Sequence, residues 1–74
     1  MSAPPLPPAM LRRAIGRLTA QRGSDAIKAE SARCLDDFKG WMKQHAPELD
    51  EAEIAAHAQG MVIAVLHSAI AQTR

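Results

Sequence analysis

Few side chains in this sequence have the type and spacing that catalysis requires. Ser24, Ser31 and Ser68 lack an adjacent base together with an orienting acid, which a serine nucleophile needs. Asp36 and Asp37 are neighbours in the sequence, but on a helix they point to different parts of the surface and form no carboxylate dyad. We therefore expect that this protein is not an enzyme.

Histidine and cysteine, which often bind transition metals, are scattered along the chain. His57 and His67 are ten residues apart, nearly three helical turns, which is too far to share a metal ion within one chain. His45 is expected to be a cation near the C-terminal end of a helix, or a residue packed at the edge of the apolar arc, rather than a metal ligand. The single Cys34 forms no internal disulfide and lies in an apolar pattern typical of a buried residue. We expect no metal, no cofactor and a cytoplasmic protein.

The first 22 residues are strongly basic. Four arginines and no acid give this segment a charge of +4, whereas the whole chain carries +1. Arg13 and Arg17 share the helix face opposite an apolar stripe, with Arg12 at its edge, which suits a solvated basic face or a face for phosphate or carboxylate groups. These arginines are not arranged to read bases. We assign to them the electrostatic steering of a protein partner, with nucleic-acid binding as an alternative.

Three helices are predicted to position these side chains. They cover about residues 8–21, 24–45 and 51–72. Residues 1–7 form a Pro-rich arm, which we expect to be extended and flexible. Residues 8–74 then form a single helical domain. The connection over residues 46–49 is short, so the second and third helices should be antiparallel neighbours.

The second helix is predicted to be amphipathic, with Ser24 as its N-cap and Ala46-Pro47 at its end. The only two aromatic residues lie on its apolar arc and should anchor the core or an interface. The apolar arc consists of Ile27, Ser31, Cys34, Leu35, Phe38, Trp41, Met42 and His45. The opposite, solvent-facing arc consists of Glu30, Arg33, Asp36, Asp37, Lys39 and Lys43. Ion pairs three or four residues apart explain these charges without a binding site.

The third helix combines strong start signals with an excess of apolar surface. Asp50 and Glu53 have the spacing of a capping box, and Leu49 and Ile54 that of a hydrophobic staple. From Ala55 to Ala71 there is no Lys, Arg, Asp, Glu or Pro. The apolar stripe is wider than one partner helix needs. It consists of Ile54, Ala58, Met61, Val62, Val65, Leu66 and Ala69, extended by Ile63 and Ile70.

The predicted partner or dimer interface therefore lies mainly on the third helix. It consists of His57, Gln59, Met61, Val62, Ile63, Leu66 and Ile70, together with Trp41 of the second helix. Ala56, Gly60, Ala64 and Ser68, spaced by four residues, form a small-residue face that would let another backbone approach closely. The apolar run over residues 60–66 is too short to span a bilayer, and we expect no contact with a membrane.

One stretch resembles a known family. The run Glu51-Ala52-Glu53-Ile54-Ala55-Ala56-His57-Ala58-Gln59, followed by Leu66-His67-Ser68, is similar to the C-terminal helix of the TraM family of quorum-sensing antiactivators of conjugal plasmids. Asp25-Ala26-Ile27-Lys28 resembles the start of that family's long earlier helix. The resemblance implies a helical homodimer that binds a LuxR-type transcription factor and stops it from binding DNA. This chain is shorter, has a tighter link between its second and third helices, and lacks the family's apolar tail.

The sequence thus predicts an all-α protein of two to three antiparallel helices with a long C-terminal helix, assembled as a helical-bundle homodimer. Its predicted function is inhibition of a protein partner, with a LuxR-type regulator as the partner that the resemblance implies. A phage or plasmid inhibitor of another host protein is the first alternative. A nucleic-acid-binding accessory protein that uses the arginines of the first helix is the second.

Overall fold

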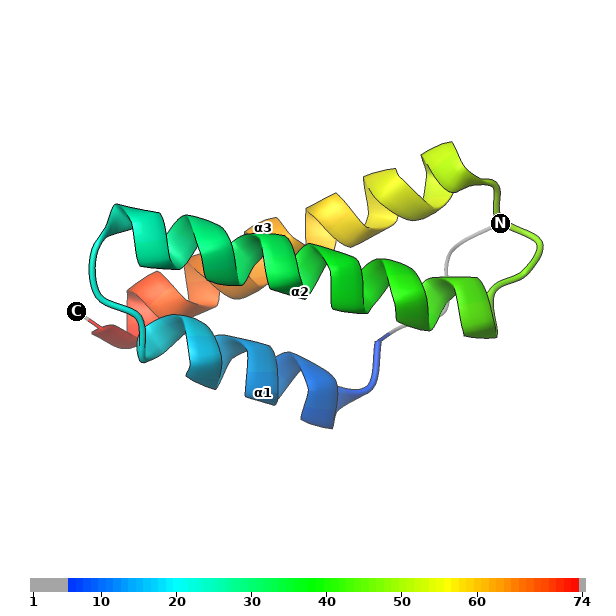
Figure 1. Ribbon diagram of the computed structural model, residues 1–74. Helices are drawn as coiled ribbons and strands as arrows, with labels where there is room; N and C mark the ends of the chain where they lie inside the picture. Colours follow the sequence, from blue (N-terminus) through cyan, green and yellow to red (C-terminus); the bar gives the residue numbers. More distant parts are fainter. Residues whose placement is uncertain (1–5, 74) are drawn as a thin grey trace.

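The computed structural model describes residues 6–73, and within this range the chain forms three helices and no strand. They are α1 (Pro8–Thr19), α2 (Ser24–His45) and α3 (Glu51–Thr73). Each helix runs opposite to the one before it, so α1 and α3 point the same way and α2 the other (Figure 1). The predicted all-α class is confirmed, and residues 1–5 of the Pro-rich arm lie outside the described range.

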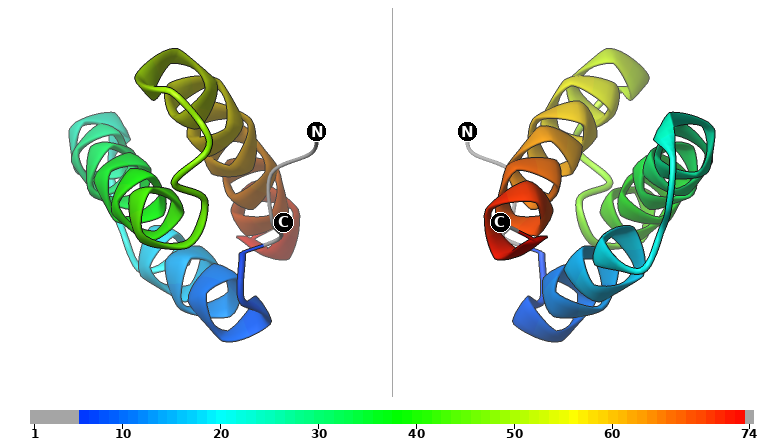
Figure 2. Two further views of the ribbon diagram at one scale, coloured as in Figure 1. Left: turned by 90° about the vertical axis from the view of Figure 1, so that its right-hand side faces the viewer. Right: turned by 90° about the vertical axis from the view of Figure 1, so that its left-hand side faces the viewer.

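Seen end-on, the three helices occupy the corners of a triangle (Figure 2). α3 contacts both α1 and α2 extensively, whereas α1 and α2 touch each other much less. The described chain is elongated, with principal extents of 38 × 22 × 15 Å. α3 is therefore the helix against which the other two pack.

The core runs along the inside of this triangle. Phe38, Met42 and Cys34 of α2 are its largest fully buried side chains. The other buried apolar residues are Leu6, Ala14, Leu18, Ala46, Leu49, Ile54, Ala58, Val62, Val65 and Ala69. Leu6 corrects the expectation of a flexible arm over residues 1–7, because its side chain is buried against this core. An apolar side chain next to the first helix gains more from burial than it loses in chain freedom.

The turn between α1 and α2 differs from the prediction. α1 ends at Thr19, two residues before the expected end near 21. Gly23, not Ser24, occupies the N-cap position of α2, and no side chain forms a capping hydrogen bond there. Gly23 has a φ of +86°, which glycine adopts at little cost and other residues rarely adopt. Gly23 therefore makes the sharp turn and takes the N-cap position that was predicted for Ser24.

The start of α3 follows the prediction closely. The backbone N–H of Glu53 donates to Asp50 Oδ1 at 2.8 Å, and the backbone N–H of Asp50 donates to Glu53 Oε1 at 3.1 Å. Leu49 and Ile54, on either side of this capping box, are both buried. The predicted capping box is confirmed, and the burial of both staple residues fixes the angle at which α3 leaves the turn.

α3 also passes a simple test of length and composition for a membrane-crossing helix. Within the described residues it alone does so, over Glu51–Gln72, with a mean hydropathy of 1.5 in its most apolar window. The sequence prediction considered only the shorter run over residues 60–66. Core helices of soluble proteins pass the same test, but only 28% of this window is buried inside the protein. What covers the rest of α3 becomes the question for function.

Candidate protein-binding surface

α3 presents two apolar faces. The first is turned inward and is buried by this chain's own helices; it consists of Ile54, Ala58, Val62, Val65 and Ala69. Val62 was predicted to lie in a partner interface, and this is wrong, because its side chain packs in the core. The residue after it, Ile63, is turned about 100° further around the helix and points away from that core.

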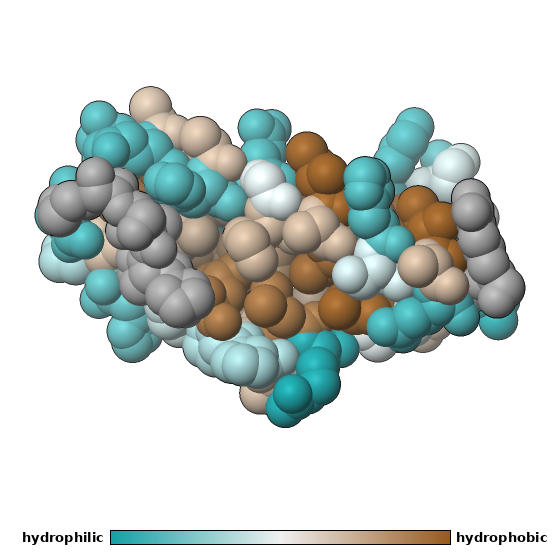
Figure 3. Space-filling view, turned by 180° about the vertical axis from the view of Figure 1, so that it is seen from behind, coloured by the Kyte–Doolittle hydropathy of each residue, from teal (hydrophilic) through white to brown (hydrophobic). Residues whose placement is uncertain are grey.

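The second face is exposed. Ile63 and Ile70, two helical turns apart, are 55% and 51% exposed, the highest values among the exposed large apolar residues of the described chain. His57 and Gln59 are also exposed, as predicted. Apolar side chains gather along the middle of the side on which α3 lies, between polar ends (Figure 3). Since no charged residue interrupts α3 from Ala55 to Ala71, this face is poorly suited to water.

Other predicted interface residues occupy intermediate positions. Met61 and Leu66 are partly buried and pack against the edge of the core, so each still exposes part of its side chain. Trp41 lies on α2, where its ring stacks on that of His45 with centroids 4.5 Å apart and planes at 23°. The described structure therefore stacks the tryptophan on a residue of its own helix, and the two most exposed large apolar residues, Ile63 and Ile70, lie on α3.

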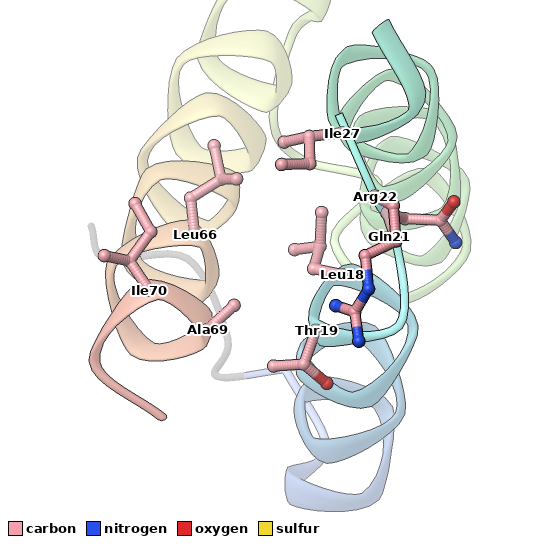
Figure 4. A pocket seen from close by; sticks show the side chains of 8 residues that line it. All are labelled: Leu18, Thr19, Gln21, Arg22, Ile27, Leu66, Ala69 and Ile70. Atoms are coloured by element: carbon pink, nitrogen blue, oxygen red, sulfur yellow. The ribbon is translucent and has the colours of Figure 1, made fainter. Parts of the chain in front are cut away.

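A pocket of about 200 Å³ lies where all three helices meet near the C-terminal end of α3. It is lined by Leu18, Thr19, Gln21, Arg22, Ile27, Leu66, Ala69 and Ile70. Side chains of α3 face those of α1 and α2 across it, and the guanidinium of Arg22 lies among the α1 side chains (Figure 4). Because Leu66 and Ile70 also lie on the outer part of α3, the pocket continues the exposed apolar surface toward α2.

The three arginines predicted to steer a partner have different environments. Arg12 and Arg13 are exposed. Arg17 instead reaches toward α2, where its Nη2 lies 2.7 Å from Glu30 Oε2 and its Nη1 lies 3.5 Å from Asp37 Oδ2. The prediction of a shared outer face for Arg13 and Arg17 is thus wrong, because an ion pair between α1 and α2 draws Arg17 inward.

The sequence prediction was wrong about the burial of Glu30. It was expected on the solvent-facing arc, but its side chain is only 4% exposed. Arg33 lies 3.8 Å from its Oε1, and Oε2 makes no hydrogen bond of good geometry within the described residues, so the 2.7 Å contact with Arg17 is an ion pair rather than an aligned hydrogen bond. The missed signal was spacing, because Glu30 lies four residues before Cys34 on the line that continues to Phe38.

This buried carboxylate has a structural role. Arg17 and Arg33 lie within 4 Å of its oxygens, and Asp37 contacts the same Arg17 guanidinium. Burial raises the pKa of Cys34, and the neighbouring Glu30 carboxylate raises it further, so the thiol stays protonated and unreactive at neutral pH. Within residues 6–73, no group of three His, Cys, Asp or Glu residues could hold a metal ion. The cluster holds α1 against α2.

No protein family, curated protein or solved structure matches this chain. The surface of α3 and the charges around it therefore carry the functional argument, and the resemblance to the TraM family stays a prediction.

Proposed function

We propose that this protein is a small helical inhibitor that binds another protein through the apolar surface of α3 and works as a homodimer. The observation that carries the proposal is the pair Ile63 and Ile70, each about half exposed on a helix face without charge. Full burial of such a side chain stabilises by roughly 1.5–3 kcal/mol, so covering the exposed half of each contributes on the order of 1 kcal/mol. A partner helix that packs along this face would be stabilised in this way at several positions.

The proposed partner class is a LuxR-type transcription factor, whose binding to DNA the protein would block by sequestering it in the cytoplasm. The support is the similarity of α3 to the last helix of the TraM family, at Glu51-Ala52, Ile54, His57-Ala58-Gln59, Leu66 and Ser68. Arg12 and Arg13 remain exposed and would speed the encounter with an acidic partner surface. Arg17 is engaged with Glu30 and contributes to this less.

The proposal is tested with a purified LuxR-type regulator from the same host and a DNA fragment that carries its operator. Adding the protein should dissolve the regulator–DNA complex in a gel shift, and a complex of the two proteins should appear on size exclusion. Ile63→Asp should abolish both effects, while Ala32→Asp, on an exposed position of α2, should leave them intact. A regulator that stays on its operator at a large excess of the protein would overturn the LuxR assignment.

Two alternatives make different predictions in the same assays. An inhibitor of another host protein would leave every LuxR-type regulator unaffected but would still lose its partner on Ile63→Asp. A nucleic-acid-binding protein would shift DNA by itself, more weakly at higher salt, and would lose this activity on Arg12→Ala and Arg13→Ala. The ion pair that holds Arg17 leaves this second alternative fewer free cations on α1.

A further inference from the structure

Five apolar residues and one glutamine on the outer side of α3 follow a regular repeat. Steps of four, three, four, three and four residues connect Ala52, Ala56, Gln59, Ile63, Leu66 and Ile70, which we call the α3 seam. All of them are exposed except Leu66, which is partly buried. Alternating steps of three and four are the spacing by which two helices pack side chains into each other along their length. The inward face has a similar but less regular pattern, with steps of four, four, three and four residues from Ile54 through Ala58, Val62 and Val65 to Ala69.

Side-chain size changes along the seam. Its N-terminal half has the small Ala52 and Ala56, whereas its C-terminal half has Ile63, Leu66 and Ile70. Two parallel copies would place alanine against alanine at one end, leaving a gap, and isoleucine against isoleucine at the other. Two antiparallel copies would match large with small throughout the seam, with residue 70 opposite 52, 66 opposite 56 and 63 opposite 59.

Charge favours the same orientation. Glu51 and Glu53 lie in the first turn of α3, and Arg22 lines the pocket beside Ile70 near its other end. Antiparallel pairing brings the acidic turn of one copy beside Arg22 of the other and also opposes the two helix dipoles. Lys39 and Lys43 of α2 lie next to that acidic turn, so the charges favour this orientation less strongly than the packing does.

We propose that a second copy of this chain covers the α3 seam, with the two α3 helices antiparallel and their crossing point between Gln59 and Ile63. This inference rests on the homodimer of the proposed function and assigns its face. The seam extends over 19 residues, or about 27 Å of helix, and is one helix wide. The surface that it can bury is small beside the roughly 800 Å² per partner of a standard interface. The dimer is therefore weak and exchanges subunits. Because the copies exchange, a target helix binds the same seam in place of the second copy.

Cysteine cross-linking tests the orientation directly. Ala52→Cys and Ile70→Cys are made in separate chains, mixed and oxidised. The native Cys34 serves as an internal control, because its thiol is buried and should not cross-link. Antiparallel pairing predicts a disulfide-linked dimer in the mixture and almost none from either variant alone, since identical positions then lie about 27 Å apart. Ala32→Cys, on an exposed part of α2, should form no dimer with either variant.

The outcomes of these experiments distinguish parallel pairing, antiparallel pairing and a monomer. Strong dimers from Ala52→Cys alone would show parallel pairing and overturn the orientation, while the inhibitor proposal would stand. Sedimentation across the micromolar range should show a dimer that Ile63→Asp dissociates without loss of helical circular dichroism. A wild-type protein that stays monomeric throughout this range overturns the inference. A monomer that still removes a regulator from DNA would leave the inhibitor proposal intact, so the two failures are distinguishable.

Discussion

α2 and α3 have nearly the same length, 22 and 23 residues, but they differ in how much of their apolar surface the rest of the chain covers. The outward arc of α2 is charged, and its apolar arc is turned into the core. α3 is also buried on one face, yet its outward face is apolar as well, with Ile63 and Ile70 exposed. The difference separates a helix whose apolar face is buried by the rest of the chain from a helix that also exposes an apolar face.

The two helices also differ in the group that is out of its usual environment, a buried charge on α2 and an exposed apolar surface on α3. α2 buries one charge, Glu30, and the chain compensates it with Arg17 from α1. α3 exposes an apolar surface, and nothing in the described part of the chain covers it. A buried ion pair is satisfied inside the molecule, whereas an apolar face is satisfied only by contact. The first feature therefore concerns stability, and the second is the basis of the proposed binding function.

The largest expected effect comes from adjacent residues on the two faces of α3. Val62→Asp places a charge in the core and should lower the free energy of unfolding by roughly 3–5 kcal/mol, enough to unfold a domain of this size. Ile63→Asp, one residue later, should change it by less than about 1 kcal/mol in the monomer, because the side chain is 55% exposed. Urea titrations followed by circular dichroism measure both. Equal losses would contradict the assignment of two faces.

Removing the partner of the buried charge on α2 should have the next largest effect. Arg17→Ala leaves Glu30 buried beside only Arg33, and should cost about 2 kcal/mol, below the 3–5 kcal/mol of a fully buried pair because Arg17 is 40% exposed. The matched control is Arg13→Ala, on the same helix and exposed, with an expected change within about 0.5 kcal/mol.

A double variant separates the charge from the packing. Combining Arg17→Met with Glu30→Met removes both charges and should restore most of the stability lost in Arg17→Ala, since apolar side chains of similar size suit this site. If the double variant is less stable than Arg17→Ala alone, the ion pair contributes net stability and the cost of burying Glu30 is smaller than we infer.

The start of α3 should show a smaller loss. Asp50→Ala removes the acceptor of the 2.8 Å hydrogen bond from the Glu53 backbone and should cost about 1 kcal/mol of unfolding free energy. Glu48→Ala, an exposed acid two residues earlier, is the control and should have little effect. A loss that grows with protein concentration would indicate that the start of α3 also acts in a dimer, as expected for a seam that begins at Ala52.

How far the sequence predicts this molecule depends on the kind of signal. Local signals worked: the capping box of Asp50 and Glu53, and the proline at the start of α1, act within one turn and appear as expected. Signals that depend on a neighbouring helix did not. Glu30 was placed on the solvent-facing arc together with the other charged residues of the second helix, and only the position of α1 brings Arg17 beside it.

The site was predictable to the same degree. The composition of α3 indicates an excess of apolar surface, but not which side folding covers. Val62 and Ile63 are adjacent and similar in character, and only the packing of α1 and α2 separates a core residue from an exposed one. Gly23 shows the same limit at a turn, because both Gly23 and Ser24 are common capping residues and the backbone conformation decides between them.

The smallest expected effect compares two glycines, one in the middle of each long helix. Gly40 of α2 and Gly60 of α3 are exposed, and an added Cβ would meet nothing within 4 Å at either position. Alanine at each should therefore raise the free energy of unfolding by up to about 1 kcal/mol through its higher helix propensity. Thermal melts at low and high protein concentration measure both gains.

The comparison is informative because Gly60 belongs to the small-residue face with Ala56 and Ala64, roughly 80° around the helix from the middle of the α3 seam. If a second copy packs on the seam, Gly60→Ala and Gly40→Ala should raise the free energy of unfolding by the same amount at every protein concentration. If the copies instead meet on the small-residue face, the added methyl group would hold the two backbones apart. The gain of Gly60→Ala would then fall, or change sign, as the concentration rises, while that of Gly40→Ala would not.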